Sequence, residues 1–237
     1  MKSTVKNMDK KILFETHLHT VEISPCAQVS YTEIPEIYLN AGYGGIIVTD
    51  HYSPYALNVL PQSTLDAKID QYFRVAHKLA EEGARKGLQV LIGAEVTIFL
   101  RDLPQDFLIY GDIEKPFRKR REVYDFCSAD LYKFCLDHNF LMFQAHPLRS
   151  GWALIEDFKN LHGLEVFNGN NHADNAYART VALCEKHKLM QIAGGDFHGR
   201  GFEGRAGIYL PKSCRTVMDF IGYYRNNTPE LYIKTEN

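Results

Sequence analysis

Short apolar runs alternate along the chain with longer segments of helical periodicity. Residues 65–86 carry apolar side chains at three- and four-residue steps, which predicts a helix with one buried face. Similar stripes over 31–41, followed by Gly42 as a C-terminal cap, and over 177–184 predict two more helices. The apolar runs of strand length cover residues 12–16, 45–49, 89–94, 107–110, 140–144, 163–167, 190–193 and 206–210.

This alternation is typical of βαβ units around a parallel sheet. Seven or eight such units in 237 residues fit a β/α barrel better than an open sheet, although periodicity alone is compatible with both. The sequence contains no internal repeat, no low-complexity stretch and no linker rich in Pro, Gly or Ser. We therefore expect a single β/α barrel domain over residues 1–237.

Composition excludes several classes of function. The chain has 27 basic and 29 acidic residues, so it lacks the excess of positive charge that marks a nucleic-acid surface. Its one basic run, residues 118–121, is typical of a solvated helix face or turn. We see neither the apolar core of an export signal nor a stretch long enough to span a membrane. The five scattered cysteines suit a reducing compartment, so we expect a cytoplasmic protein.

Polar residues able to bind metals follow almost every predicted strand. Because the carboxyl ends of parallel strands meet on one face of a β/α barrel, these side chains are expected to converge on one pocket. Imidazoles combined with a few carboxylates form the ligand set preferred by zinc, iron or manganese. The residues concerned are Glu15, His17, His19, Asp50, His51, Glu95, His146, Asn168, Asp196 and His198.

The spacing of these residues has a mechanical reason. Residues i and i+2 of an extended segment point to the same side, so His17 and His19 can bind one ion while Leu18 packs the other way. Asp196 and His198 repeat that spacing. His172 comes just past another predicted strand, where it is either a pocket residue or an ordinary loop histidine.

In order and type, these residues resemble the motifs of the polymerase and histidinol phosphatase (PHP) family. The resemblance runs from Glu15 to His198 and implies a distorted seven-stranded β/α barrel. It also implies two or three divalent metal ions at the carboxyl ends of the strands, and hydrolysis of phosphate esters. The motifs are Thr16-His17-Leu18-His19-Thr20, Val48-Thr49-Asp50-His51, Gly93-Ala94-Glu95, Ala145-His146-Pro147 and Gly194-Gly195-Asp196-Phe197-His198.

The resemblance implies a ligand set for each ion. One ion would be bound by His17, His19, Glu95 and Asp196, with Glu95 bridging to a second ion. The second ion would use His146 and a further histidine, but the corresponding residues 106–112 offer only carboxylates.

A third ion would use His51, His198 and a residue of the loop after His19. That loop contains Glu22 and Cys26. A Cys26 thiolate would suit zinc, while the alternative is a small buried residue beside a proline.

These features predict a metal-dependent phosphoesterase. Adjacent cations lower the pKa of a bound water and deliver it as hydroxide to phosphorus. Arg149, three residues after His146, is the expected clamp for the phosphoryl group, because a guanidinium engages two oxygens at once. Asn168 and His172 are expected to contact the substrate or the groups behind the ligands.

Two alternatives remain open. An amidohydrolase-type enzyme also begins with His-x-His on a barrel strand but attacks carbon, although the Asp196-x-His198 pair and Glu95 favour the phosphoesterase. A non-catalytic regulatory module with a degenerate second metal site is supported by the missing histidine. We expect the partner to be a small phosphorylated substrate, with no membrane or nucleic acid involved, and the sequence does not identify that substrate.

Overall fold

The computed structural model describes residues 10–149, 157–170 and 176–234. Their strands are β1 (Lys11–Glu15), β2 (Gly45–Val48), β3 (His51–Tyr52), β4 (Gln89–Leu100), β5 (Leu103–Tyr110), β6 (Leu141–Gln144), β7 (Gly163–Asn168), β8 (Met190–Gly194), β9 (Ala206–Pro211) and β10 (Glu230–Ile233). The helices are α1 (Ile34–Asn40), α2 (Pro54–Asn58), α3 (Leu65–Lys86), α4 (Glu114–Lys119), α5 (Ser128–Asp137), α6 (Tyr177–His187) and α7 (Val217–Asn226). Two short 3-10 helices cover Val123–Asp125 and Phe158–Asn160.

The strands form one sheet that curls into a distorted, nearly closed barrel. In the described part of the chain the sheet order is β10-β9-β1-β2-β4-β5-β6-β7-β8, with β3 added beside β4. The segments after β1 and β8 meet, because Leu18 pairs with Phe197 and the amide of His19 donates to the Phe197 carbonyl at 3.1 Å. The expected distorted β/α barrel is therefore confirmed, with nine strands along the sheet path instead of seven.

The direction of β5 differs from the sequence-based expectation of a parallel sheet. β4 pairs with β5 and β5 with β6 in antiparallel register, while β1, β2 and β4 and then β6, β7 and β8 are parallel. β4 and β5 form a hairpin in which Leu100 pairs with Leu103. As a result, the amino end of β5 lies at the same end of the barrel as the carboxyl ends of the parallel strands.

β4 is also longer than expected. The strand predicted over 89–94 continues to Leu100, so Glu95 lies within β4 and not after it. Up to Ile92, β4 pairs with β2, whereas Glu95 pairs with His51 of β3 on one side and with Leu108 of β5 on the other. Glu95 is thus held on both sides by strand pairing.

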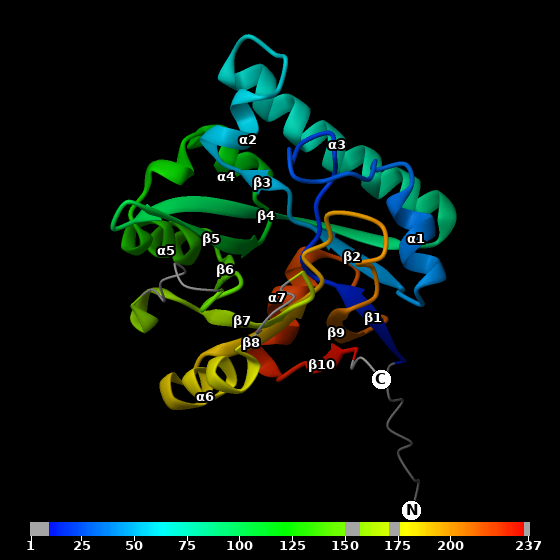
Figure 1. Cartoon of the computed structure of the whole chain (residues 1–237), viewed down its shortest axis with the longest axis vertical. Coiled ribbons are helices and arrows are strands. Elements are labelled where there is room, and N and C mark those ends of the chain that lie inside the picture. The colour runs from blue at the N-terminus through cyan, green and yellow to red at the C-terminus, as the bar shows by residue number, and fades with distance from the viewer. Residues whose placement is uncertain (1–9, 150–156, 171–175, 235–237) are drawn as a thin grey trace, which may run out of the picture.

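Helix α7 lies within the ring of strands in the view of Figure 1. The Phe220 ring lies 5.0 Å from that of Tyr110, and the Tyr224 ring lies 5.5 Å from that of Phe143. Burial of these aromatic side chains is a large favourable term for the fold. α7 thus joins an apolar cluster on the inner side of β5 and β6, made of residues other than the polar ones that follow the strands.

The predicted helices pack outside the barrel (Figure 1). α3 covers the bounds expected from its periodicity, and the side chain of Thr64 caps it by accepting a hydrogen bond from the Ala67 amide at 3.2 Å. α1 begins at Ile34, later than the predicted stripe, and Gly42 follows it with φ +85°. No helix of the described ranges has both the length and the apolar character needed to cross a membrane.

The basic run at 118–121 lies at the end of α4 and faces acidic side chains of α3. Arg118 pairs with Asp70, and Arg121 pairs with Asp66 at 2.9 Å. The guanidinium of Arg120 lies over the Phe126 ring. These contacts agree with the interpretation of the run as a solvated helix face.

Candidate metal centre

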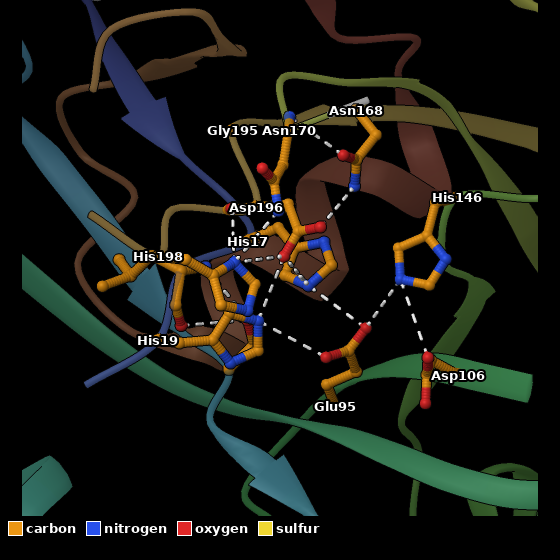
Figure 2. Close-up of polar contacts among 12 residues, drawn as sticks. His17, His19, Glu95, Asp106, His146, Asn168, Asn170, Gly195, Asp196 and His198 are labelled. Carbon is orange, nitrogen blue, oxygen red and sulfur yellow. Dashed lines mark hydrogen bonds and ion pairs between the residues drawn. The ribbon is translucent and has the colours of Figure 1, made fainter. Parts of the chain in front are cut away.

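The four side chains expected to bind the first ion lie together where β1 and β8 end (Figure 2). His17 Nε2 is 3.2 Å from Glu95 Oε1 and 3.4 Å from Asp196 Oδ1. His19 Nε2 is 3.4 Å from Glu95 Oε2 and 3.2 Å from Asp196 Oδ1. Leu18, between the two histidines, packs into the apolar core, as the alternating pattern predicts.

This group fits a cation. His17 Nε2, His19 Nε2 and Glu95 Oε2 are buried, and within the described residues none of them makes a well-directed hydrogen bond. They lie close to one another and to charged neighbours instead, with Glu95 Oε2 2.9 Å from His51 Nδ1. A buried polar atom without a hydrogen bond lowers the stability of the fold by on the order of 1–3 kcal/mol. A cation bound between these three atoms would compensate for that loss. The ligand atoms of His17, His19 and Glu95 all lie within 4.8 Å of one another, which suits a single ion.

Three of the four side chains are held in the form that binds a cation. The exception is His17: burial opposes its charged form, but Asp196 and Glu95 raise the pKa of its imidazole well above the usual value, so an ion would have to displace a proton from it. Burial opposes ionisation of Glu95, but His17 and His51 lower the pKa of its carboxyl well below the usual value. Burial also opposes ionisation of Asp196, and His17 and His19 again lower the pKa of that carboxyl. Burial, together with the charge of His51, lowers the pKa of His19 to about 3. At neutral pH both carboxyls are therefore ionised and His19 is neutral.

Addition of Zn²⁺ or Mn²⁺ is expected to stabilise the protein. At a free metal concentration of about 100 times Kd, binding to the native state adds about 2.7 kcal/mol. For a chain of this size the melting temperature should rise by about 5–10 °C. Differential scanning calorimetry of chelator-treated protein with and without metal measures the shift, and an unchanged melting temperature with zinc, manganese and iron would contradict a metal centre.

A second group contains Asp106, which the sequence analysis did not single out. His146 Nε2 lies 3.2 Å from Glu95 Oε1 and 3.7 Å from Asp106 Oδ2 (Figure 2). The side chain of Thr97 donates to Asp106 Oδ1 at 2.6 Å and orients the carboxylate. Asp106 lies in the amino-terminal half of β5, within the residues 106–112 where the resemblance implies a histidine. Its placement depends on the antiparallel direction of β5.

A third group lies at the edge of the centre. His19, His51 and His198 bring ligand nitrogens within 4.8 Å of one another, and Cys26 Sγ lies 3.0 Å from His198 Nε2. Burial opposes ionisation of Cys26, but hydrogen bonds from His198 and His51 lower the pKa of its thiol to about 7. Cys26 is exposed, so the alternative of a small buried residue is wrong.

Glu22, the other ligand candidate of this loop, points elsewhere. Its carboxylate accepts hydrogen bonds from the Ser30 hydroxyl at 2.6 Å and from the Tyr31 amide at 3.2 Å. Glu22 therefore stabilises the loop after His19 by hydrogen bonds within it, and Cys26 is the residue of this loop that lies beside His51 and His198. The groups overlap, because His19 belongs to the first and the third and Glu95 to the first and the second. His51 also brings a ligand atom within 4.8 Å of those of Glu95 and Asp106, and such overlapping clusters suggest more than one metal ion.

Two of the candidate ligands have strained backbones. His146 has φ +31° and Asp196 has φ +49°, in the left-handed region that non-glycine residues rarely adopt. Such strain persists where the surrounding structure imposes it, and it concentrates at functional sites. Here the His146 amide donates to Glu165 Oε2 at 2.7 Å, and the Gly195 amide, just before Asp196, donates to Glu15 Oε1 at 2.6 Å.

Buried carboxylates behind the centre hold its loops. Asp50 accepts from the Thr20 amide at 2.7 Å and from the Ser24 hydroxyl at 2.7 Å, and Ser24 contacts His19 Nδ1 at 3.2 Å. Glu15 accepts from the His17 amide at 3.0 Å as well as from Gly195. Asp50 follows the strand predicted over 45–49, and Glu15 is near the end of the strand predicted over 12–16. Both are among the residues expected to converge on the pocket, where they support the loops that carry the ligands. Burial raises the pKa of Asp50 to about 6 and that of Glu15 to about 7.

A cavity of about 420 Å³ opens onto the centre and is bordered by one arginine. Nη1 of Arg149 lies 4.0 Å from Asp196 Oδ2, and its side chain is 30% exposed. Asn168 instead lies behind Asp196, to which its amide donates at 3.2 Å. His172 lies outside the described residues. The lining residues are Cys26, His51, Glu95, Asp106, His146, Arg149, Asn170, Asp196 and His198.

Searches against protein-family models and against curated proteins give no match. A two-domain protein from Bacteroides vulgatus that contains a predicted PHP-like metal-dependent phosphoesterase does match, with a TM-score of 0.68 and 15% identity over 96% of this chain. The chain has the PHP-like fold. The match covers 66% of the Bacteroides chain, slightly less than two thirds of its length.

Two further structures share the PHP-like fold of this chain. An amidohydrolase from Chromobacterium violaceum matches 88% of this chain and 95% of its own length, with a TM-score of 0.59 and 15% identity. The lesion-specific endonuclease PfuEndoQ from Pyrococcus furiosus matches 94% of this chain and 58% of its own length, with a TM-score of 0.62 and 11% identity. At these identities the matches establish the fold, and they confirm the resemblance found in the sequence at that level.

Proposed function

We propose that the protein is a metal-dependent phosphoesterase that hydrolyses a phosphate monoester of a small metabolite or a nucleotide. The proposal rests mainly on one observation: three overlapping groups of candidate metal ligands and Arg149 lie around the same cavity of about 420 Å³. A cavity of this size accommodates a small ligand. Its positive charge comes from Arg149 and from the ions that the ligand groups would hold.

Each residue has a defined part in this reaction. Bound divalent ions supply Lewis acidity and an activated water. Arg149 holds two oxygens of the phosphoryl group through its planar guanidinium and restricts its orientation. Asn168 keeps the Asp196 carboxylate in place from behind, through the 3.2 Å hydrogen bond.

The chemistry of the ligands points to different ions at the two ends of the centre. Cys26, His51 and His198 present sulfur and nitrogen, which suit zinc. Glu95, Asp106 and His146 present mainly carboxylate oxygen, which suits manganese or iron. In this proposal Asp106 supplies the position left open in the second ligand set, which weakens the argument from the missing histidine for a degenerate, non-catalytic module.

The second candidate is an amidohydrolase acting on carbon. It is favoured by the likeness to the Chromobacterium violaceum structure, which is described as an amidohydrolase. Arg149 favours the phosphoesterase, because a guanidinium beside the ligands matches a dianionic phosphoryl group better than a neutral amide.

A substrate screen with metal analysis distinguishes these functions. Purified protein supplied with zinc, manganese or iron is incubated with aryl phosphates, phosphodiesters and amides, and its metal content is measured in parallel. We expect turnover of phosphomonoesters that depends on metal and is lost with a chelator. Turnover of amides alone would support the amidohydrolase. Metal binding without turnover of any of the three classes would support the non-catalytic module.

A further inference from the structure

Glu165 is a buried carboxylate on β7 that contacts two candidate ligands of the centre, His17 and His146. Its side chain is fully buried, and it is not among the described residues that line the cavity. Nothing in the motif pattern marks it, since it lies inside a predicted strand and not after it. Its contacts reach His17 after β1, His146 after β6, and Asn168 at the end of β7.

The first contact involves His17. Glu165 Oε1 lies 3.0 Å from His17 Nδ1. A carboxylate oxygen only accepts, so Nδ1 carries the hydrogen in this contact. In a neutral ring the lone pair is then on Nε2, the atom that faces Glu95 and Asp196. Glu165 thus selects the His17 tautomer able to bind an ion at this position.

The second contact involves the loop after β6. Glu165 Oε2 accepts from the His146 amide at 2.7 Å and thereby holds a residue whose φ is +31°. This turn directs the His146 ring toward Glu95 Oε1, at 3.2 Å. The same carboxylate oxygen accepts from Asn168 at 2.9 Å, and Asn168 donates in turn to Asp196.

The third observation is the glycine that makes room for this arrangement. A Cβ added at Gly194 would lie 2.6 Å from His17 Cβ and 2.9 Å from Glu165 Oε1. Real Cβ atoms do not approach so closely, so any other residue at this position would push the His17 ring and the carboxylate apart. This accounts for the first glycine of the Gly194-Gly195-Asp196 motif.

We propose that Glu165 is a positioning residue shared by two neighbouring ion sites: it sets the His17 tautomer for one and the His146 turn for the other. Carboxylates behind metal-binding histidines commonly raise metal affinity by about 10–100-fold. Because Glu165 supports one ligand of each ion, the affinities of both sites for metal are expected to depend on this side chain. The proposal rests on the proposed function only in requiring that the centre binds metal ions.

The test is the metal affinity of Glu165→Gln. The amide oxygen can accept one of the two hydrogen bonds from His17 and His146, but its NH₂ group cannot accept the other. We expect the affinities for the first two Zn²⁺ ions to fall by about 10–100-fold each, measured at 25 °C by competition with a chromophoric chelator. Glu185→Gln, at an exposed position on α6, is the matched control and should bind Zn²⁺ like the wild type. No substrate is needed, so the result is independent of whether phosphate esters are hydrolysed.

Two further measurements separate positioning from a merely structural role. In the Zn²⁺-loaded wild type, ¹⁵N NMR of the imidazoles should show His17 with hydrogen on Nδ1, and this signal should shift in Glu165→Gln. Glu165→Asp retains the charge but is shorter by one methylene, so its Zn²⁺ affinities should lie between those of the wild type and Glu165→Gln. If Glu165→Gln does not fold, Glu165→Asp takes its place.

Wild-type affinity for both ions in a folded Glu165 variant would overturn the proposal. Loss of affinity for one ion alone would overturn the claim that the residue is shared. A wild-type protein that binds no Zn²⁺ would instead contradict the metal centre itself.

Discussion

His17→Ala and Asp196→Ala are expected to lose metal binding at the first ion site and nearly all hydrolysis. Both side chains contribute ligand atoms to the same small space, where His17 Nε2 lies 3.4 Å from Asp196 Oδ1. Bound metals stabilise a phosphoryl transition state by several kcal/mol, and a loss of about 4 kcal/mol corresponds to about a thousandfold in rate. Steady-state turnover of an aryl phosphate at saturating metal, with metal content measured in each variant, checks this.

The fold should survive these two substitutions. His17 and Asp196 lie at strand ends among polar groups, while the apolar core is formed by other residues, including those of α7. Circular dichroism should therefore match the wild type. His77→Ala is the matched control, because His77 is an exposed histidine on α3 whose side chain pairs with Glu114. Full activity in either His17→Ala or Asp196→Ala would mean that the site lies elsewhere.

Arg149→Ala is expected to lower turnover by about a hundredfold while leaving metal content unchanged. Arg149 borders the cavity but has no ligand atom, so its loss removes a contact to the phosphoryl group and spares the ions. Removal of one preorganised electrostatic contact to a developing charge costs about a hundredfold or more in kcat. Kinetics on a phosphomonoester, with metal quantified in the same samples, measures the effect.

Arg149→Lys provides the sharper comparison. An ammonium group retains the charge but lacks the planar fork that engages two oxygens, so it should restore activity only in part. Arg179→Ala, on the exposed side of α6, is the control for loss of an arginine and should have wild-type turnover. Wild-type turnover in Arg149→Ala would exclude this residue from the site. Loss of metal along with activity would indicate a structural role instead.

The candidate site was largely predictable because its residues follow strands that are recognisable from local pattern. Apolar runs and helical stripes depend on the few residues around each position, and α3 has the bounds that its stripe predicts. Polar residues that follow parallel strands then converge because the strands share a direction. This reasoning predicts that His17, His19 and Asp196 meet in one pocket, and the resemblance to the PHP family implies that they bind the same ion.

The position of Asp106 was not predictable in this way. An apolar run such as 107–110 has the same pattern whichever direction the strand runs. The direction of β5 depends on a two-residue hairpin loop, Arg101 and Asp102, in which both residues have positive φ, 49° and 63°. Hairpins of this kind usually contain Asn-Gly or Asp-Gly, so Arg-Asp carries no clear turn signal. The antiparallel strand is what brings the Asp106 carboxylate to His146.

Features that depend on local sequence pattern were predictable, whereas features that depend on contacts between distant residues were not. The amino-acid order sufficed for the fold class and most strands, which follow from periodicity, and for the convergence of the polar residues, which follows from the common direction of parallel strands. The assignment of His17, His19, Glu95 and Asp196 to one ion is what the resemblance to the PHP family implies. The exchange of the expected histidine for Asp106, the choice of Cys26 over Glu22 and the contacts of Glu165 depend on side chains far apart in the chain. Glu165 and His17 are 148 positions apart, and their separation of 3.0 Å exists only because β1, β7 and β8 pack together with a glycine at position 194.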